Sequence, residues 1–574
     1  MELKTNILIV GGGTGGIAAA IAATNLDQDV VLVTDADWVG GQLTAQLVPA
    51  DESLWVESVG GTARYRAYRQ AVRRYYRDHY PLTPEACTNP LLNPGNCMLN
   101  LCSYEPRVGV AVLAQMTAWA EARGNLRILR GWTPTGADTD HDRVRAVQFR
   151  HRDGRELVVQ AAYVLDATDL GDLLPLTGAE YRVGSESQSQ TGELHALPGK
   201  PDPTRVQAFT WCAAVSYDRR PGADHRIAKP ARYEHFRNWR YESLATDVSG
   251  LRISFQTPSH RGVQQFALLP EEFVVGKHPF PLWIYRRVLA VANFPAELAP
   301  QEITLVNWPM NDYFDGPVVD VSTTEREQNF SEARELTRSL IYWLQHEAPR
   351  PDGGTGYPGI CLRPDVSGTA DGLAQEPYIR EGRRLEAQFM VSENHVGVHA
   401  RTGFAIPAHQ RLTPDQRRVV LSKKICAEQF ADSVGTGFYG IDIHRHVGGE
   451  PGPNLEVFPY QIPLGALLPV RLRNLLPAAK NLGVTHLTNG CYRLHPTEWN
   501  IGEAAGSLAA YCLRHGIEPA QVRGPVHLGD FQALLRQQGV DLEWPEEHST
   551  IQHPEFLKKL HAAGVPINQP RYYC

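Results

Sequence analysis

The chain has 574 residues, more than one simple hydrophobic core organises, so we expect two or three domains. Apolar residues make up 43% of the chain and charged residues 21%, which is typical of a globular protein and not of a disordered or fibrous one. The net charge of −7 argues against nucleic acid and anionic membranes as partners, and no apolar run reaches the roughly 18 residues of a membrane span.

The strongest motif lies near the N-terminus. Thr5 to Val10 reads as a short buried strand, followed by an Ala/Ile-rich helix and a second strand, Val30 to Thr34. The turn before the helix contains Gly-x-Gly-x-x-Gly and consists of Gly11, Gly12, Gly13, Thr14, Gly15 and Gly16. Such glycines allow a tight turn and a close approach to a diphosphate, and the helix N-terminus offers free N–H groups to it. Asp35 ends the second strand, where an acid binds ribose hydroxyls, so the segment predicts a bound dinucleotide.

The compartment is predicted from the N-terminus and the cysteines. The first strand begins within a few residues of the N-terminus, without a leader pattern before it. The nine cysteines are scattered, and an odd, dispersed set is typical of reduced thiols. No Cys/His group has zinc or iron–sulfur spacing, so we expect no metal. We therefore expect a cytoplasmic protein.

A second glycine pair follows the second strand. Gly40 and Gly41 precede Gln42, and glycines here let the chain run beside the ribityl chain and ring of a flavin. An NAD-only Rossmann domain does not need them. The pattern resembles the FAD-binding half of the glutathione-reductase and fumarate-reductase superfamilies. This resemblance implies that the dinucleotide is FAD, with Gly41 and Gln42 beside the flavin.

The next segments alternate between helices and strands. The helix at Tyr65 to Tyr80 is basic and aromatic, and its tyrosines either pack on the domain or form a binding stripe. The further elements that we expect here are a helix at 106–122, a strand at 126–129, and a hairpin of strands 145–150 and 156–159 around Asp153 and Gly154. Arg107, which opens the second helix, either contacts the cofactor phosphates or belongs to the scaffold.

Cys97 and Cys102 have a spacing that is similar to the redox pair of flavin disulfide reductases. In those enzymes the pair follows the second strand's glycines directly, whereas here it lies in a Pro/Asn-rich loop about fifty residues later. A catalytic disulfide, a structural bridge and an adventitious pair all stay open.

A third segment supports FAD. The strand Ala162 to Leu165 leads to Ala167 and Thr168, which resembles the Ala-Thr-Gly strand end of FAD proteins. Asp169 stands where glycine is usual, so the shape of this turn stays open. The resemblance implies that Ala167 and Thr168 contact the cofactor.

The middle of the chain reads as a second, mixed unit. We expect a loop or domain crossing at 186–205, a long strand at 206–217, a helix at 331–346, and a return toward the first unit at 419–426. The aromatic and amide cluster Asn307 to Tyr313 either lines a cleft or forms a packed turn.

The C-terminal part carries a fourth segment. Asn474 to Asn481 reads as a strand and turn, and an Ala-rich helix opens at Gly502 and runs to about Arg514. Arg493, Pro496 and Thr497 resemble an Arg-x-x-Pro-Thr stretch of the FAD-dependent oxidoreductase family, whose relatives include fumarate reductases and the flavoprotein subunit of heterodisulfide reductase. In that family the stretch precedes a helix that points its N-terminus at the pyrimidine edge of the flavin, where its positive end stabilises the anionic reduced flavin.

Together these segments predict an α/β fold. We expect a discontinuous, Rossmann-like three-layer FAD-binding domain made of residues 1–185 and 426–516. A mixed β-rich substrate domain at 186–425 is inserted into it. A small helical extension at 517–574, with helices near 530–538 and 554–563, follows.

The resemblance implies which residues bind FAD. They are Gly11, Gly13, Thr14, Gly15, Gly16, Asp35, Gly41, Gln42, Ala167, Thr168, Asn481, Arg493, Thr497 and Gly502. A second nucleotide-binding glycine motif is absent, since the glycine-rich stretch at 353–359 follows no strand and contains Pro358. We therefore expect no separate NAD(P) domain.

Three polar groups are candidates for proton transfer, which needs a base that titrates near neutral pH. The first candidate is His495, with Tyr492 or Glu498, close to the expected flavin edge. The second is His444 with His446, in the segment Gly440 to His446. The third is the segment Pro377 to Arg384, which resembles an Arg-rich Arg-Glu-x-Arg-Arg stretch of the same family. Any of these side chains can instead be structural.

The sequence thus predicts an FAD-dependent oxidoreductase that transfers hydride between flavin and a small organic substrate. Its electron partner is expected to be external: O₂, a quinone or a carrier protein. The alternatives are a flavoprotein subunit that relays electrons within a larger complex, and a non-redox protein that uses FAD as a structural ligand or sensor. Substrate, direction of the reaction, covalent attachment of FAD and oligomeric state stay open.

Overall fold

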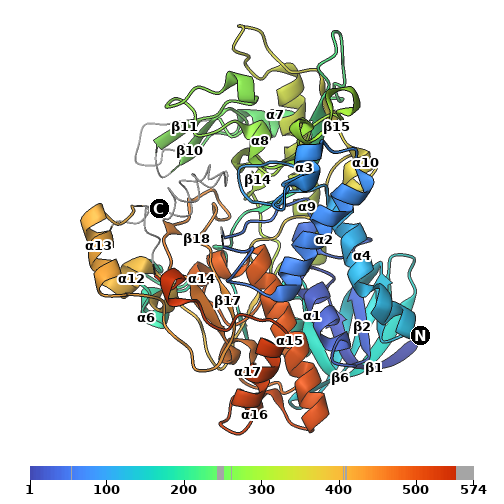
Figure 1. The fold of residues 1–574 in the computed structure, drawn as a ribbon, viewed down its shortest axis with the longest axis vertical. Helices are drawn as coiled ribbons and strands as arrows, with labels where there is room; N and C mark the ends of the chain where they lie inside the picture. The colour runs from blue at the N-terminus through green and yellow to red at the C-terminus, as the bar shows by residue number, and fades with distance from the viewer. Residues whose placement is uncertain (54, 242–250, 260–261, 405, 407–409, 551–574) are drawn as a thin grey trace.

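The computed structural model describes residues 1–53, 55–241, 251–259, 262–404, 406 and 410–550. Elements from both ends of the chain lie side by side. Figure 1 shows the blue N-terminal helix α1 next to the red C-terminal helix α15, while most green and yellow elements from the middle of the chain lie above them. The two ends therefore build one unit, as the sequence predicts.

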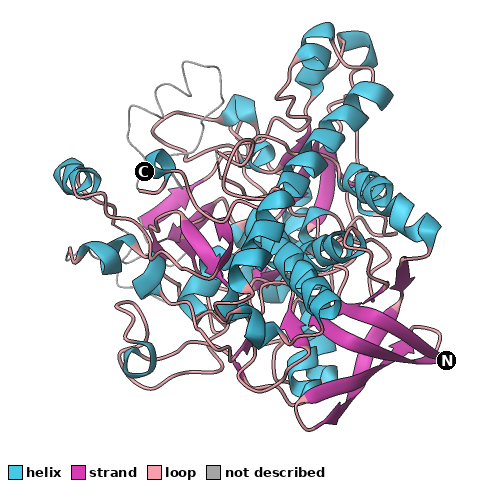
Figure 2. Cartoon of the chain, turned by 60° about the horizontal axis from the view of Figure 1, so that its bottom comes forward, coloured by secondary structure: helices cyan, strands magenta, loops and turns pink. Residues whose placement is uncertain are grey.

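The main sheet is parallel at its centre. β1 (Glu2–Val10) pairs in parallel with β2 (Val30–Thr34) and β6 (Glu156–Asp166), and β2 pairs with β3 (Leu126–Arg130). Residues Ile7 to Val10 of β1 and all of β2 are buried, as expected of parallel strands that are covered on both faces. Figure 2 shows these strands (magenta) near the N-terminus, with helices (cyan) packed across them.

β6 is one long strand with two different neighbours on the same side. Its first half pairs antiparallel with β5 (Arg143–His151), which pairs with β4 (Trp132–Asp140). Its second half pairs in parallel with β21 (Leu475–Pro477) from the C-terminal part. The sequence analysis was wrong to separate 156–159 from 162–165. The first half alternates in burial and the second is continuously buried, so one strand carries two patterns.

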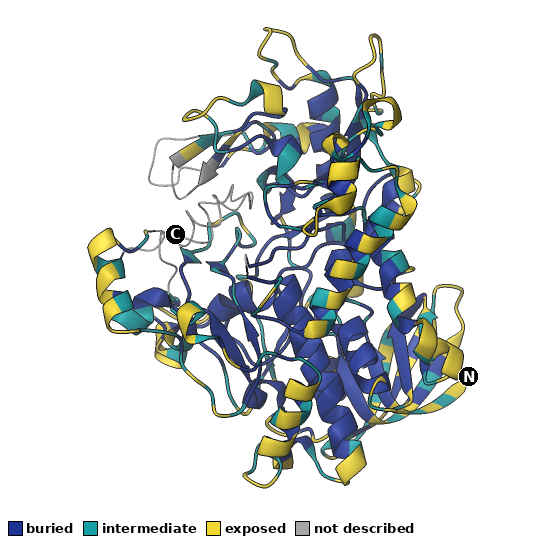
Figure 3. Cartoon of the chain, in the orientation of Figure 1, coloured by how far each residue is buried: buried dark blue, intermediate teal, exposed yellow. Residues whose placement is uncertain are grey.

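Helices α1 (Thr14–Thr24) and α15 (His495–His515) pack with their backbones in close approach. A Cβ atom at Gly502 would lie 1.9 Å from the Gly15 carbonyl oxygen, and one at Gly506 would lie 2.3 Å from that of Ala19. α15 begins at His495 and not at Gly502, because Pro496 is tolerated in a first helical turn. Figure 3 shows both helices as buried as the sheet that they cover.

This contact gives a first testable expectation. Substituting Gly502→Ala should lower the melting temperature, because the new methyl group overlaps backbone atoms of α1 and such overpacking costs about 2 kcal/mol or more. The matched control is Gly529→Ala in α17 (Leu528–Gln537), where a Cβ meets nothing within 4 Å. That change should stabilise the protein by about 0.5–1 kcal/mol through helix propensity. Equal melting temperatures for the two variants would contradict the packing argument.

A second, antiparallel sheet lies in the middle of the chain. Its strands, in spatial order, are β12 (Arg287–Leu289), β13 (Ile303–Val306), β9 (Ala213–Tyr217) and β15 (Ile360–Leu362). The long strand expected at 206–217 is wrong: β8 (Phe209–Thr210) pairs instead with β14 (Asp312–Tyr313). The chain changes partners at Trp211, whose carbonyl accepts a hydrogen bond from the Thr337 hydroxyl.

The helices mostly follow their sequence patterns. α2 (Ala63–His79), α4 (Pro106–Arg123) and α17 confirm the predicted helices. α9 (Thr323–His346) starts earlier than predicted because the Ser322 hydroxyl caps it by accepting from the Glu325 amide. The segment 186–205, predicted as a loop, contains the short helix α6 (Gln188–Thr191). The helix predicted at 554–563 lies outside the described residues.

The fold also contains several short elements. They are η1 (Gly41–Leu43), α8 (Leu282–Tyr285), β17 (Ser433–Gly437), β18 (Ile441–Asp442), β19 (Asn454–Leu455), β20 (Tyr460–Pro463) and α14 (His486–Tyr492).

Candidate active site

The glycine loop at the start of α1 divides into packing glycines and one open position. A Cβ at Gly11 would lie 2.1 Å from the Ala167 carbonyl oxygen, and one at Gly16 would lie 2.0 Å from that of Gly11. At Gly13, the N-cap of α1, the nearest atom to a Cβ is Glu498 Oε1 at 3.7 Å. Gly13 has no side chain that could cap the first N–H groups of the helix. The face of Gly13 at the N-terminus of α1, where an anionic ligand would bind, is therefore free of close backbone contacts, and the Glu498 carboxylate is the nearest group to it.

Asp35 lies at the end of β2, at the edge of this loop. Its carboxylate accepts a hydrogen bond from Arg152 Nε at 3.1 Å, and Arg152 also contacts Asp37 at 2.9 Å. Arg152 belongs to the turn between β5 and β6, so the hairpin that the sequence predicts reaches the end of β2. Arg107 on α4 lies 5.5 Å from the ring centre of Trp38, a cation–π contact in the same region.

The second glycine pair packs on the first loop. Gly41 has a φ of +52°, and a Cβ there would lie 2.8 Å from Gly13 Cα. The next residue, Gln42, is buried, and its amide donates to the Arg493 carbonyl at 3.0 Å and to the carboxylate of Glu498. Glu498 in turn accepts from the Gly15 amide at 3.4 Å. Residues from both ends of the chain therefore meet at the N-terminus of α1.

The end of β6 lies next to the turn after β21. The buried Asp166 carboxylate accepts from the amide and hydroxyl of Thr168, and burial raises the pKa of Asp166 to about 7. Asn481 donates to the Asp166 carbonyl at 3.1 Å. Asp169, which replaces the usual glycine, pairs with Lys480 at 2.5 Å. An ion pair between the buried Lys480 and the half-buried Asp169 thus takes the place of the glycine turn.

His495 is fully buried at the first residue of α15. Its Nδ1 atom accepts a hydrogen bond from the Asp51 amide at 3.1 Å, so the ring carries its proton on Nε2. Nε2 makes no well-aligned hydrogen bond, although the Val48 backbone beside the ring favours the protonated form. Burial, with Arg286 as the next cause, lowers the pKa of His495 to about 3. The neutral ring therefore offers a hydrogen-bond donor, and it does not take up a proton near neutral pH.

Tyr492 and Thr497, on either side of His495, contact β20. The Tyr492 hydroxyl donates to the Gln461 carbonyl at 2.7 Å, and its ring stacks on Tyr460 with 4.4 Å between ring centres. The Thr497 hydroxyl lies 3.4 Å from that of Tyr460. The structure thus places these two side chains in packing contacts behind the start of α15.

A network of charged side chains extends from Arg493 toward the second sheet. Arg493 donates to the Tyr378 hydroxyl at 2.5 Å and to the Asp442 carbonyl at 3.0 Å. The ring of His444 lies between two carboxylates, 2.6 Å from Asp312 and 3.5 Å from Asp442.

Asp312 is the buried anchor of this network. Arg380 approaches its carboxylate at 3.0 Å, and the Thr210 hydroxyl donates to it at 2.5 Å. Burial raises the pKa of Asp312, but the charges of Arg380 and His444 outweigh this and hold it below its usual range. Asp312 therefore stays ionised and fixes the ring orientation of His444.

The loop after η1 joins this network. The Gln375 amide donates to the Ala45 carbonyl at 3.0 Å, which brings the segment that carries Tyr378 against the loop that follows Gln42. Arg286, next to β12, lies 3.6 Å from Asp51, the residue whose amide contacts His495. Asp51 and Arg286 were not predicted from the sequence, whereas Tyr378 and Asp442 lie in two segments that the sequence singles out, without a role assigned to either residue. Asp312 was present in the aromatic and amide cluster at 307–313, but its role was not recognised.

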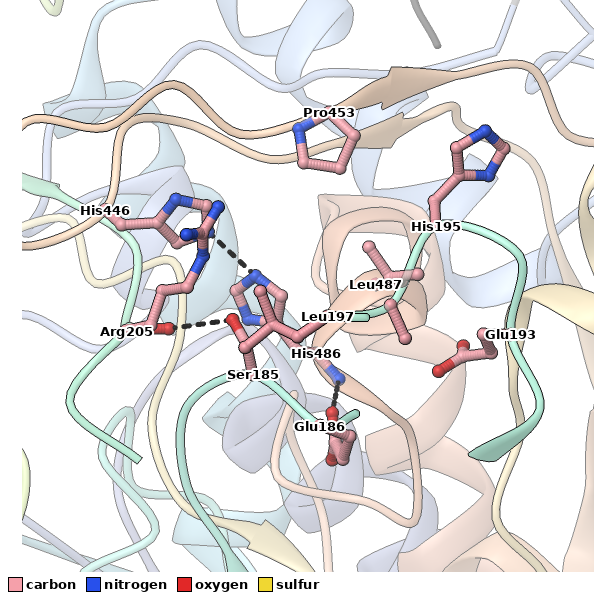
Figure 4. A pocket seen from close by; sticks show the side chains of 11 residues that line it. Ser185, Glu186, Glu193, His195, Leu197, Arg205, His446, Pro453, His486 and Leu487 are labelled. Carbon is pink, nitrogen blue, oxygen red and sulfur yellow. Dashed lines mark hydrogen bonds between the residues drawn. The ribbon is translucent and has the colours of Figure 1, made fainter. Parts of the chain in front are cut away.

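The other histidines form a separate buried cluster. His446 Nε2 lies 3.0 Å from His486 Nε2, and His486 Nδ1 lies 2.9 Å from Glu381. Burial and His486 lower the pKa of His446 to about 2. The cavity beside this pair has a volume of about 30 Å³, enough for about two water molecules, and Figure 4 shows Ser185, Glu186 and Arg205 around it. The structure thus separates His446 from His444, although the sequence groups them.

Cys97 and Cys102 are separate thiols in the structure. Cys97 Sγ lies 3.4 Å from Asn100 Oδ1, and Cys102 Sγ lies 4.0 Å from the Arg69 carbonyl oxygen. Burial raises the pKa of both thiols, which disfavours the reactive thiolate.

The residues of the candidate site fit an extended dinucleotide with a polar ring. The open space at Gly13 and the N–H groups of α1 suit a diphosphate. Several buried polar atoms of the site lack a well-aligned hydrogen-bond partner, as expected where a ligand supplies it. They are Gln42 Oε1, Gln46 Oε1, Asn481 Oδ1, Arg493 Nε and His495 Nε2. In the described part of the chain, no helix combines the length and apolar character that crossing a membrane requires.

Parts of several solved enzyme structures are similar to part of this chain. L-proline dehydrogenase from P. horikoshii has 14% identity over 29% of this chain and 23% of its own, with a TM-score of 0.16. CabE, an aromatic hydroxylase from angucycline biosynthesis, has 16% identity over 39% and 40%, with a TM-score of 0.22. Sdh1 from Mycobacterium smegmatis, solved with UQ1, has 14% identity over 38% and 41%, with a TM-score of 0.21. The matches span less than half of each of these structures, and we infer no substrate from them.

None of the curated proteins matches the chain. A family match, in contrast, extends over most of the chain. A model of the family described as FAD dependent oxidoreductase matches residues 6–535, which include the glycine loop, the polar network and helix α15. The chain therefore belongs to the FAD dependent oxidoreductase family, and FAD is its cofactor.

Proposed function

We propose that this protein is an FAD-dependent oxidoreductase that acts on a small polar organic molecule and exchanges electrons with an external partner. The supporting observation is the polar network that runs from Arg493 through Asp442 and His444 to Asp312. It begins beside the expected flavin edge at the start of α15 and ends on β14, next to the second sheet. We propose that the substrate binds between these parts, with residues 186–425 as the inserted substrate domain.

Each part of FAD has proposed contacts in this site. The Gly11–Gly16 loop with Thr14 holds the diphosphate. Asp35 binds the ribose once its hydrogen bond with Arg152 is broken. The part of FAD that leads from the diphosphate to the flavin ring is contacted by Gly41, Gln42, Ala167, Thr168 and Asn481. Gly502 allows α15 to approach α1, while Arg493 and Thr497 hold the start of α15 at the pyrimidine edge. Bound FAD supplies a ring that accepts or gives a hydride.

His495 and His444 take different roles in this proposal. His495 is neutral and presents a donor N–H from the start of α15, which suits a hydrogen bond to the cofactor or substrate better than proton abstraction. His444 is oriented by an ionised carboxylate and its side chain stays 28% exposed, so it can exchange protons with a substrate. We therefore propose His444 as the proton-transfer residue, in place of His495, Tyr492 and Glu498.

The described cysteines give little support to an electron relay within a complex. Cys97, Cys102, Cys212, Cys491 and Cys512 are buried, and Cys87, which is exposed, has no cysteine partner among the described residues. An enzyme that completes its own redox reaction is the better supported function.

The test uses the purified full-length chain. We expect a yellow protein that releases FAD on heating, and a screen of small polar metabolites without oxygen should find compounds that bleach the visible flavin absorbance. Rapid return of the colour in air would identify O₂ as the electron acceptor, whereas slow return would point to a quinone or carrier protein. A folded protein that cannot bind FAD would overturn the proposal.

A further inference from the structure

Glu498 lies in the place where an anionic ligand of α1 should bind. Its Oε1 atom accepts a hydrogen bond from the Gly15 amide, one of the free N–H groups in the first turn of α1. The same oxygen is the nearest atom to the open face of Gly13, 3.7 Å from where a Cβ would be. Since a diphosphate binds through these N–H groups, the carboxylate and the diphosphate compete for one position.

The charges around Glu498 make this competition costly. Lys480, from the turn after β21, faces it and is already paired with Asp169 from the end of β6. The other partners are the uncharged Gln42 amide of η1 and the Gly15 amide of α1. A third acid, Glu376, interacts with the same lysine and with Asp169, and burial raises the pKa of Glu376 to about 8. Three acidic groups thus share one lysine before the diphosphate adds its own negative charge. In a buried site, charges of one sign raise each other's energy strongly.

A proton on Glu498 removes this repulsion. Burial raises the pKa of Glu498, the Lys480 charge opposes the rise, and Asp169 adds to it. A neutral carboxyl group no longer needs the positive end of α1, and it can donate to a phosphate oxygen in place of accepting from Gly15. No other described acidic side chain hydrogen-bonds to a backbone amide of the Gly11–Gly16 loop.

We propose that Glu498 controls the loading of FAD: its carboxylate occupies the diphosphate position at α1, and FAD binds with uptake of one proton by Glu498. The inference rests on FAD as the cofactor and not on the proposed substrate or on His444. It assigns Glu498 to cofactor binding, a role distinct from proton transfer to the substrate.

The test measures FAD affinity and proton uptake, not turnover. Apoprotein is titrated with FAD between about pH 5.5 and pH 8.5, following the quenching of flavin fluorescence. Above the pKa of Glu498 in the apoprotein, the dissociation constant should rise about tenfold per pH unit, because the complex holds one proton more than the free protein. Calorimetry in two buffers of different ionisation enthalpy should count about one proton taken up. ADP-ribose, which has the diphosphate and no flavin, should show the same uptake and so exclude titration of the flavin ring.

The deciding variant is Glu498→Gln. Glutamine is nearly isosteric with glutamate and keeps an oxygen for the Gly15 amide. Its NH₂ group can donate to the Gln42 side-chain oxygen, so we expect the variant to fold. It should bind FAD more tightly than the wild-type protein at high pH, with no proton uptake. Glu498→Asp should retain the uptake because it retains an acid.

A matched control removes a charge elsewhere on α15. Glu503 pairs with Arg64 and the Trp499 indole, away from the glycine loop. Glu503→Gln should keep the uptake of one proton. Unchanged pH dependence in Glu498→Gln, or weaker FAD binding by that variant at every pH, would overturn the proposal. A wild-type protein that binds FAD tightly without proton uptake would also overturn it, while leaving the proposed function intact.

Discussion

Substituting Gly13→Val should yield a folded, colourless protein. A Cβ at this position meets no protein atom closer than 3.7 Å, and the nearest atom is the end of the Glu498 side chain, so we expect the apoprotein to keep its fold. The same atoms fill the space that a diphosphate needs in front of α1. We expect FAD binding to weaken by at least about a hundredfold, since such an overlap costs about 3 kcal/mol. Fluorescence titration of the apoprotein with FAD measures the loss, and a melting curve shows that the fold is kept.

Two further glycines serve as controls for this experiment. Gly199→Val adds the same side chain where a Cβ has nothing within 4 Å, and it should leave FAD binding unchanged. Gly15→Val should damage the fold itself, because its Cβ would lie 1.9 Å from the Ala478 carbonyl oxygen. A Gly13→Val protein with a full complement of FAD would show that the diphosphate binds elsewhere.

Substituting His444→Ala should leave FAD bound and slow the bleaching of the flavin by substrate about 10²- to 10⁴-fold, the usual contribution of a proton-transfer group. The expectation follows from the position of the ring between Asp312 and Asp442, in a network that reaches Arg493. Stopped-flow absorbance without oxygen measures the rate, with a substrate found in the metabolite screen. Added imidazole should restore part of the rate, which a purely structural role would not allow.

The control is His141→Ala on the surface. His141 also lies 2.6 Å from a carboxylate, that of Asp140, but its side chain is almost fully exposed. The flavin of the His141→Ala variant should be bleached by substrate at the wild-type rate. If His444→Ala also bleaches at that rate, His444 has no part in the reaction, whereas a slow rate without imidazole rescue would assign it to scaffolding.

The cofactor half of the molecule could be predicted from sequence because its signals are local. The strand, glycine loop, helix and acid at the N-terminus lie within one short segment, and each glycine has a steric reason that spacing reveals. The structure confirms β1, α1, β2 and the joining of both ends of the chain. Helix boundaries and the division of β6 and β9 were less accurate, because pairing partners far away in the chain decide where a strand ends.

The substrate side could not be predicted in the same way. His444, Asp312 and Arg493 come from three distant segments, and no spacing in the sequence links them. Grouping His444 with His446 was reasonable from sequence, because residues two apart in a regular strand face the same side. The strand β18 ends at Asp442, so this rule does not apply to the two histidines. Here His446 faces His486 and His444 faces Asp312.

The cofactor class, the α/β architecture and the glycine loop at the start of α1 follow from the residue pattern alone, since these depend on backbone geometry that glycines and a buried strand specify locally. The tertiary structure decided the rest: which histidine meets a carboxylate, which one stays neutral in the core, and that Glu498 reaches the N-terminus of α1. The physical reason is that the charge state and hydrogen bonding of a side chain depend on burial and on neighbours, and packing brings those neighbours together from remote parts of the chain.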